Sequence, residues 1–186
     1  MIVESSPLPV GWIESGRPLE IDVGCHKGLF LTEMAALYPD RNFLGIERQA
    51  KRVERTNRKI QRLEMRNAAV ICGEGHETLR ALPDEVAHHI HVLFPDPWPK
   101  RRHHIRRLIQ PSFIETCLRL LKPGGILRLV TDDEPYAQDV RIHAATVAGL
   151  VARPDDRDYP MTEFQKKFLV DGRPVYALIL QKPISG

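Results

Sequence analysis

The sequence is poor in residues that build cross-linked, metal-bound or membrane proteins. Its 186 residues include three cysteines, Cys25, Cys72 and Cys117, which lie far apart. An odd number without metal-ligand spacing predicts free thiols in a reducing cytoplasm and no metal site. No apolar run approaches the roughly 18 residues of a membrane span. The first residues lack the basic and apolar regions of a secretory signal, so we expect a cytoplasmic globular protein.

Aromatic residues are also scarce, at 6%, but the remaining composition is ordinary. Hydrophobic residues make up 42% of the chain and charged residues 27%, which excludes wholesale disorder and fibrous repeats. A chain of this length suits one domain with a full core, so we predict a single domain over residues 1–186.

Positive charge is concentrated in two segments, although the net charge is only +3. Residues 41–66 contain nine Lys or Arg against three Glu, and residues 100–107 contain five Lys or Arg and no acid. Segregated charge of this kind indicates a polyanion partner, with a solvated helix face as the alternative. Alternating spacings of four and three residues predict a basic stripe along a helix. The stripe comprises Arg48, Arg52, Arg55, Lys59, Arg62 and Arg66.

Apolar runs alternate with amphipathic stretches, which favours an α/β domain with a parallel sheet. The predicted strands are 18–24, 42–47, 68–72, 89–94 and 125–131. The predicted helices are 27–37, 49–64, 111–121 and 134–150. A loop over 153–160 precedes two β-like pieces, around 164–168 and 175–181, which could form a hairpin and add an antiparallel strand.

Glycines and acids follow the first three predicted strands. Gly24 and Gly28 lie in the turn after the first strand, Glu47 ends the second, and Glu74 follows the third. Ligands of open α/β sheets bind at the carboxyl ends of the strands, where an acid accepts hydrogen bonds from ribose hydroxyls. The dinucleotide fingerprint G-x-G-x-x-G fails because His26 stands at its second glycine. The ring of acids suits a ligand with a ribose and a positive centre and repels a pyrophosphate.

The most specific segment is F-P-D-P-W-P-K-R-R-H-H-I-R-R-L over residues 94–108, after the fourth strand. Its three closely spaced prolines fix an extended loop, which presents Asp96 and Trp98 in a set geometry. A carboxylate beside an indole is suited to the edge and the face of a purine. The alternative is a proline-rich turn with Trp98 in the core.

This segment resembles the signature of the tRNA (guanine-N7-)-methyltransferase family, FPDPWPK followed by a His/Arg-rich stretch. Asp-Val-Gly at 22–24, Gly-Ile-Glu at 45–47, Glu74, Thr-Asp at 131–132 and Thr-x-Phe at 162–164 follow in family order. The resemblance implies a class I, Rossmann-like methyltransferase fold: a doubly wound, mostly parallel seven-stranded sheet with an antiparallel last strand. It also implies transfer of a methyl group from S-adenosyl-L-methionine to N7 of a guanine in the variable loop of tRNA.

The resemblance assigns roles by position, with residues 1–17 as an N-terminal arm and 153–174 as a loop and substrate-side segment. Asp96 is the candidate catalytic residue. The cofactor-binding candidates are Asp22, Gly24, Gly28, Glu47, Glu74 and Asp96. The substrate-binding candidates from the resemblance are Lys100, Asp132, Thr162 and Gln165. The aromatic and basic residues of the 94–108 segment add four more: Trp98, Arg101, Arg106 and Arg107. We expect a monomer or weak homodimer without a metal.

Two residues depart from the family pattern. His26 replaces the middle glycine of the cofactor loop, and Gln165 stands where the family usually has Glu. We expect His26 to take a negative φ, with its imidazole turned away from the cofactor. A weak or inactive homologue that only binds RNA, or a methyltransferase with another substrate, remains the alternative. His88, His89 and His91 lie at a strand start, away from the ligand edge, so we expect structural roles for them.

Overall fold

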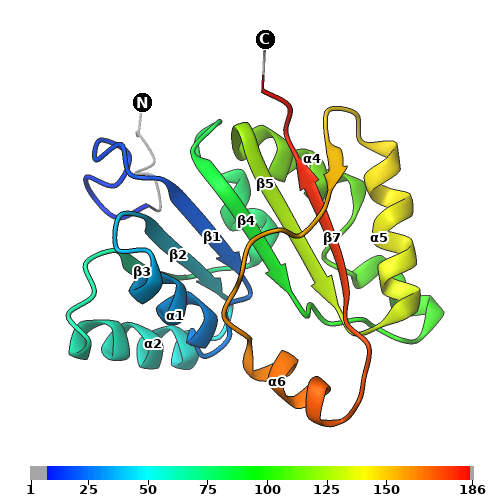
Figure 1. Cartoon of the computed structure of the whole chain (residues 1–186), viewed down its shortest axis with the longest axis horizontal. Coiled ribbons are helices and arrows are strands. Elements are labelled where there is room, and N and C mark those ends of the chain that lie inside the picture. The colour runs from blue at the N-terminus through cyan, green and yellow to red at the C-terminus, as the bar shows by residue number, and fades with distance from the viewer. Residues whose placement is uncertain (1–7, 185–186) are drawn as a thin grey trace.

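The computed structural model describes residues 8–184, which form one seven-stranded sheet in the order β3-β2-β1-β4-β5-β7-β6 (Figure 1). The strands are β1 (Leu19–Val23), β2 (Asn42–Glu47), β3 (Ala68–Cys72), β4 (Ala87–Leu93), β5 (Leu121–Thr131), β6 (Val151–Arg153) and β7 (Tyr176–Gln181). β7 is antiparallel to both β5 and β6, and the other neighbouring strands are parallel. The predicted fold is confirmed. Residues 1–7 of the expected N-terminal arm lie outside the described residues.

Helices cover both faces of the sheet. They are α1 (Leu29–Leu37), α2 (Ala50–Arg62), α3 (Gly75–Arg80), α4 (Pro111–Leu120), α5 (Glu134–Thr146) and α6 (Glu163–Val170), with a 3₁₀ helix over Arg101–Arg106. One core, called the α3–α5 core below, packs Leu79 of α3, Phe113 of α4 and Tyr136 of α5 against the strands. All three side chains are fully buried. The other core packs Met34 of α1 and Ile60 of α2 on the opposite face. Two cores on two faces make the sheet doubly wound.

Apolar and polar side chains alternate along the central strands, because successive side chains of a strand point to opposite faces of the sheet. Ile21 of β1 and Ile90 of β4 belong to the α3–α5 core, whereas Glu20 and His91 point the other way. At this polar part of the second face, the Phe30 ring of α1 meets the ring of His91 at 5.2 Å. Residues 154–162 cross the same region, running from β6 at the sheet edge to α6 (Figure 1). This crossing segment is called the strap below.

The prediction of a β-like piece around 164–168 is wrong, because this segment is α6. Thr162 caps the helix, its Oγ1 accepting a hydrogen bond of 3.0 Å from the amide of Gln165. Phe164 and Phe168 lie one helical turn apart, with their rings stacked at 6.2 Å. The piece around 175–181 is β7, as predicted. The sequence pattern also missed β6, α3 and the 3₁₀ helix, which are three to six residues long.

Candidate active site

The carboxyl ends of β1, β2, β3 and β4 open onto a pocket of about 300 Å³. Six predicted site residues line it. Four of them stand at or shortly after the end of one strand each: Gly24, Glu47, Glu74 and Asp96. The other two, Trp98 and Arg106, belong to the 94–108 segment. The sheet order places these four strand ends side by side, so residues distant in sequence meet at one edge.

Glu47 is held rigidly at the floor of this pocket. Its side chain is 6% exposed. One carboxylate oxygen accepts a hydrogen bond of 3.1 Å from the amide of His26, and the other accepts one of 2.9 Å from the amide of Gln49. Arg52 lies 3.7 Å from the carboxylate. The two backbone donors fix the orientation of the carboxylate, and its remaining lone pairs can accept hydrogen bonds from hydroxyl donors.

Glycine is required at the two positions of the turn for different structural reasons. Gly24 has φ +80, and a Cβ added there would meet nothing within 4 Å, so its backbone is open to the pocket. Gly28 has φ +65, and an added Cβ would lie 2.3 Å from the Thr56 side chain. Gly28 lines neither the pocket nor its neighbour and lets α1 approach α2 closely.

Asp22 lies in a smaller adjoining pocket of about 40 Å³, which also contacts Thr162 and Phe164. Burial, together with the nearby charge of Glu47, raises the pKa of Asp22 to about 7. The carboxyl group therefore changes its protonation state near neutral pH, and it lies beside the main pocket.

His26 contradicts the expectation of a negative φ, because its φ is 54. The tight turn requires this conformation: the amide of Gly28 donates to the carbonyl of Cys25 at 2.8 Å while the amide of His26 reaches Glu47. The imidazole lines the pocket and meets the ring of Phe164 edge-on at 5.5 Å. Burial and then the charge of Arg52 lower the pKa of His26, so the ring is neutral at pH 7.

The loop after β4 is fixed at both ends. The amide of Phe94 donates to the carbonyl of Val130 at 2.8 Å, and Arg107 Nε donates to the carbonyl of Pro97 at 2.7 Å. Phe94 and Trp98 both take left-handed backbone conformations, with φ 53 and 46. Such conformations in bulky residues persist only where the surroundings hold them, and they often mark functional sites.

The side chains that this loop presents remain accessible. Asp96 is 72% exposed and lies 3.9 Å from the guanidinium of Arg48. The guanidinium of Arg106 lies 5.2 Å from the centre of the Trp98 ring. An accessible carboxylate and an indole therefore share one pocket wall with two cations, Arg48 and Arg106.

Arg107 differs from its basic neighbours because its side chain is 1% exposed. It pairs with Asp139 and lies over the ring of Tyr136, which ties the loop after β4 to α5. We therefore assign Arg107 to holding this loop. Lys100, Arg101 and Arg106 are exposed on or beside the 3₁₀ helix and remain available to a partner.

The other predicted substrate-side residues gather near α6. Asp132, which follows β5, pairs with Arg173, which follows α6. Thr162 is buried at the start of α6 and lines the smaller pocket. Gln165 lies in the first turn of α6 and contributes its amide to the Thr162 cap.

The basic stripe on α2 begins at the mouth of the pocket, where Arg48 and Arg52 line the wall. Farther along, Arg55 and Arg62 are exposed. Lys59 donates a hydrogen bond of 2.9 Å to Thr32, so part of the stripe serves the packing of α2 on α1. Basic surfaces thus approach the pocket from α2 and from the 3₁₀ helix.

Sequence reasoning missed several pocket residues, notably His26, Phe94 and Phe164. Phe164 lies two positions after the helix cap Thr162 and contacts both His26 and Phe94, with ring distances of 5.5 and 6.3 Å. The Thr-x-Phe pattern contained this residue, but only the tertiary position of α6 brings it to the pocket.

Comparisons with known proteins identify the family. The family model described as "Putative methyltransferase" matches residues 16–178. The tRNA (guanine-N(7)-)-methyltransferase of Nitrosococcus oceani is 34% identical over 170 residues, which covers 89% of this chain and 72% of that protein. The one of Thermosynechococcus vestitus is 37% identical over 169 residues, which covers 88% of this chain and 79% of that protein. The chain belongs to the tRNA (guanine-N(7)-)-methyltransferase family.

Family membership confirms the resemblance drawn from the 94–108 segment, and solved structures agree on the fold. The aminoglycoside resistance methyltransferase NpmB1 superposes with a TM-score of 0.61 at 21% identity, covering 91% of this chain and 89% of that one. A SAM-dependent methyltransferase from Aquifex aeolicus gives 0.62 at 18% identity, covering 91% and 86%. At these identities the superpositions show the shared class I fold alone.

The described part of the chain contains no cluster of three or more His, Cys, Asp or Glu residues that could hold a metal ion. Within residues 8–184, no helix has the length and apolar character needed to span a membrane.

Proposed function

We propose that this chain transfers a methyl group from S-adenosyl-L-methionine to N7 of a guanine in the variable loop of tRNA. The observation that carries the proposal is the pocket itself: Glu47, Glu74 and Asp96 line it together with Trp98. Basic surfaces flank this pocket on two sides. Membership in the tRNA (guanine-N(7)-)-methyltransferase family supports both the reaction and the substrate.

The pocket residues fit S-adenosyl-L-methionine. Glu47, fixed by two backbone amides, and Glu74, at the start of α3, would accept hydrogen bonds from the ribose and adenine groups. The open backbone at Gly24 would allow close approach, and Asp22 would face the end of the cofactor that reaches the smaller pocket. When bound, this cofactor supplies the electrophilic methyl group.

The residues of this chain would position the guanine for methyl transfer. N7 of guanine is an unprotonated acceptor on the Hoogsteen edge, so no general base is needed before methyl transfer. Trp98 would stack on the purine, and the accessible carboxylate of Asp96 would accept hydrogen bonds from its N1–H and N2–H groups. The same carboxylate would stabilise the positive charge that the purine gains on methylation. We therefore assign Asp96 the catalytic role.

The basic surfaces would hold the RNA backbone. Arg55 and Arg62 on α2 would contact phosphates on one side of the pocket, and Lys100, Arg101 and Arg106 on the other. Asp132, Thr162 and Gln165 would border the RNA near α6. We further infer that residues 1–186 act as one methyltransferase domain in the cytoplasm, as a monomer or a weak homodimer.

The proposal is tested by incubating the purified protein with labelled S-adenosyl-L-methionine and unmodified tRNA transcripts and then mapping 7-methylguanosine. We expect label at one guanine of the variable loop. A transcript with adenine at that position is the matched control and should remain unlabelled. Tight tRNA binding without methyl transfer would favour an RNA-binding homologue, and label in another acceptor would favour a different substrate.

A further inference from the structure

The strap lies on a polar part of the sheet. Glu20 of β1 pairs in register with His89 of β4, and His91 of β4 pairs in register with Arg128 of β5. These four side chains belong to the face opposite the α3–α5 core. Because this region is polar, the strap is held there mainly by charges and aromatic rings.

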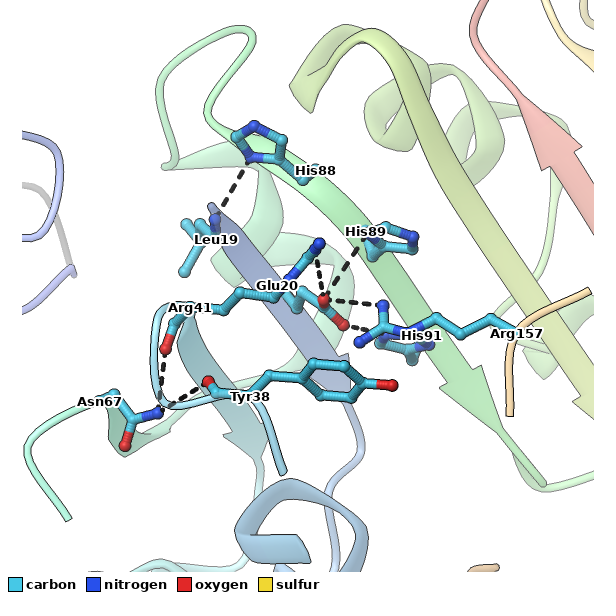
Figure 2. A network of polar contacts seen from close by, with 9 residues as sticks. All are labelled: Leu19, Glu20, Tyr38, Arg41, Asn67, His88, His89, His91 and Arg157. Atoms are coloured by element: carbon cyan, nitrogen blue, oxygen red, sulfur yellow. Dashed lines mark hydrogen bonds and ion pairs between the residues drawn. The ribbon is translucent and has the colours of Figure 1, made fainter. Parts of the chain in front are cut away.

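Glu20 is the centre of these contacts (Figure 2). Its side chain is fully buried. One carboxylate oxygen accepts hydrogen bonds from Arg41 at 3.0 Å and from Arg157 of the strap at 2.9 Å, and the other contacts His91 Nε2 at 3.0 Å. Burial alone would raise the pKa of Glu20, but the hydrogen bond from His91 and the adjacent positive charges hold it well below its usual range. Glu20 is therefore a fixed negative charge.

Arg157 joins the strap to this charge. Its guanidinium also lies over the ring of Tyr38 at 4.2 Å and near that of Tyr159 at 5.2 Å. Tyr159, farther along the strap, lies under the guanidinium of Arg128 at 4.0 Å. Asp155 accepts a hydrogen bond of 3.1 Å from the same Arg128. Three strap residues thus fix its path across the strands.

The strap leads directly into the wall of the pocket. Arg157 precedes the helix cap Thr162 by five residues, and Phe164 follows in the first turn of α6. Phe164 lines both the main and the smaller pocket. Its position relative to His26 therefore depends on where the strap ends.

We propose that Arg157 is a positioning residue for methyl transfer: by pairing with Glu20, it fixes the strap and so sets Phe164 at the pocket wall. This inference rests on the proposed function. Arg157 itself lies near the amino ends of the strands, away from the pocket, and acts through α6. Loss of its pair is expected to loosen α6 and to slow the reaction, while cofactor and RNA phosphate contacts remain.

The chain offers a matched control. Arg41 donates to the same carboxylate oxygen of Glu20 at 3.0 Å, but it comes from the turn between α1 and β2 and not from the strap. Arg157→Ala and Arg41→Ala each remove one cation from the buried carboxylate. A purely structural cost of exposing Glu20 would appear in both variants, whereas loss of strap position would appear in Arg157→Ala alone.

We expect Arg157→Ala to speed hydrogen exchange of the α6 amides and to lower kcat with tRNA, each by about tenfold or more. The Kd for S-adenosyl-L-methionine and the KM for tRNA should stay within about threefold. Arg41→Ala should change neither α6 exchange nor kcat. Arg157→Lys keeps the charge at Glu20 but loses the planar group that stacks on Tyr38, so it should recover only part of kcat.

Unchanged α6 exchange in Arg157→Ala, or an equal fall of kcat in Arg41→Ala, would overturn the proposal. A second test combines Arg157→Ala with Phe164→Ala: if Arg157 acts through Phe164, the two losses of kcat are not additive. Fully additive losses would also overturn it. Absence of methyl transfer by the unchanged protein would contradict the proposed function, whereas the exchange measurement would still decide whether Arg157 fixes α6.

Discussion

The amide of His26 donates a hydrogen bond of 3.1 Å to the buried carboxylate of Glu47, which joins the turn after β1 to the end of β2. The same carboxylate accepts from the amide of Gln49. A single side chain thereby fixes two backbone segments that border the pocket. Substitution of either residue is expected to act on the cofactor site more than on the RNA-binding surfaces.

Glu47→Ala should weaken binding of S-adenosyl-L-methionine by about 1–3 kcal/mol, because a charged acceptor is lost and two amides lose their partner. Glu47→Gln keeps the shape of the side chain and should lose less. Glu54→Ala, at an exposed position on α2, is the control and should bind normally. Titration calorimetry measures all three, and equal affinity of Glu47→Ala would place the cofactor elsewhere.

His26→Gly should raise the free energy of unfolding by about 1 kcal/mol, because glycine tolerates the left-handed backbone of the turn. Its affinity for S-adenosyl-L-methionine should change by about tenfold or less. His26→Ala removes the ring but keeps the backbone strain, so it should not gain this stability. Denaturant unfolding and calorimetry test the pair. If the unchanged protein fails to bind the cofactor and His26→Gly restores binding, the enzyme assignment fails.

Asp96→Ala should lower kcat for tRNA methylation by about a hundredfold or more. The variant loses the carboxylate that orients the guanine and stabilises the positive charge formed on methylation. Its melting temperature should be unchanged, since the side chain is 72% exposed and its nearest charged partner, Arg48, lies 3.9 Å away. Asp84→Ala, another exposed acid, is remote from the pocket and should keep full activity. Near-normal turnover in Asp96→Ala would remove Asp96 from the catalytic role.

Asp22 predicts a pH dependence of stability. Its pKa is about 7 in the folded protein and about 3.9 in an unfolded chain, so the folded state holds more protons between these values. The stability that protonated Asp22 contributes is therefore present below about pH 4 and is lost as pH rises towards 7. The melting temperature of Asp22→Asn relative to the unchanged protein should rise from pH 5 to pH 8. Glu115→Gln, at an exposed site, is the control, and its melting temperature should differ from that of the unchanged protein by the same amount at every pH. A constant difference for Asp22→Asn would contradict the assignment.

Neutralising Arg55 and Arg62 together should weaken tRNA binding and reduce its salt dependence. Each lost phosphate contact removes about 0.7 to 0.9 from the slope of log K against log salt concentration. Affinity for S-adenosyl-L-methionine should not change. Arg141→Gln, on α5 at the opposite face of the sheet, is the control. An unchanged slope would leave RNA binding to the 3₁₀-helix surface.

Much of the fold and of the pocket could be predicted from the sequence because parallel strands are buried and their carboxyl ends share one edge. Apolar runs gave the positions of β1 to β5, and the residue after each run identified Glu47, Glu74 and Asp96. These inferences need no contact between distant residues.

The features that were missed depend on such contacts. Arg107 lies within a basic run, and only its pairing with Asp139, 32 residues away, shows that it is buried. α6 is eight residues long, too short for its periodicity to separate it from a strand. The left-handed backbone of His26 follows from its hydrogen bond to Glu47, which the local sequence does not reveal.

The position of β7 has a consequence for biosynthesis. This strand lies between β5 and β6 and is antiparallel to both, so β6 has no partner in the sheet until residues 176–181 arrive. Such pairings join segments that are far apart in the chain and form slowly. While the chain is still being translated, the edge of β5 is left exposed, and this nascent form is the one that chaperones would need to protect from aggregation.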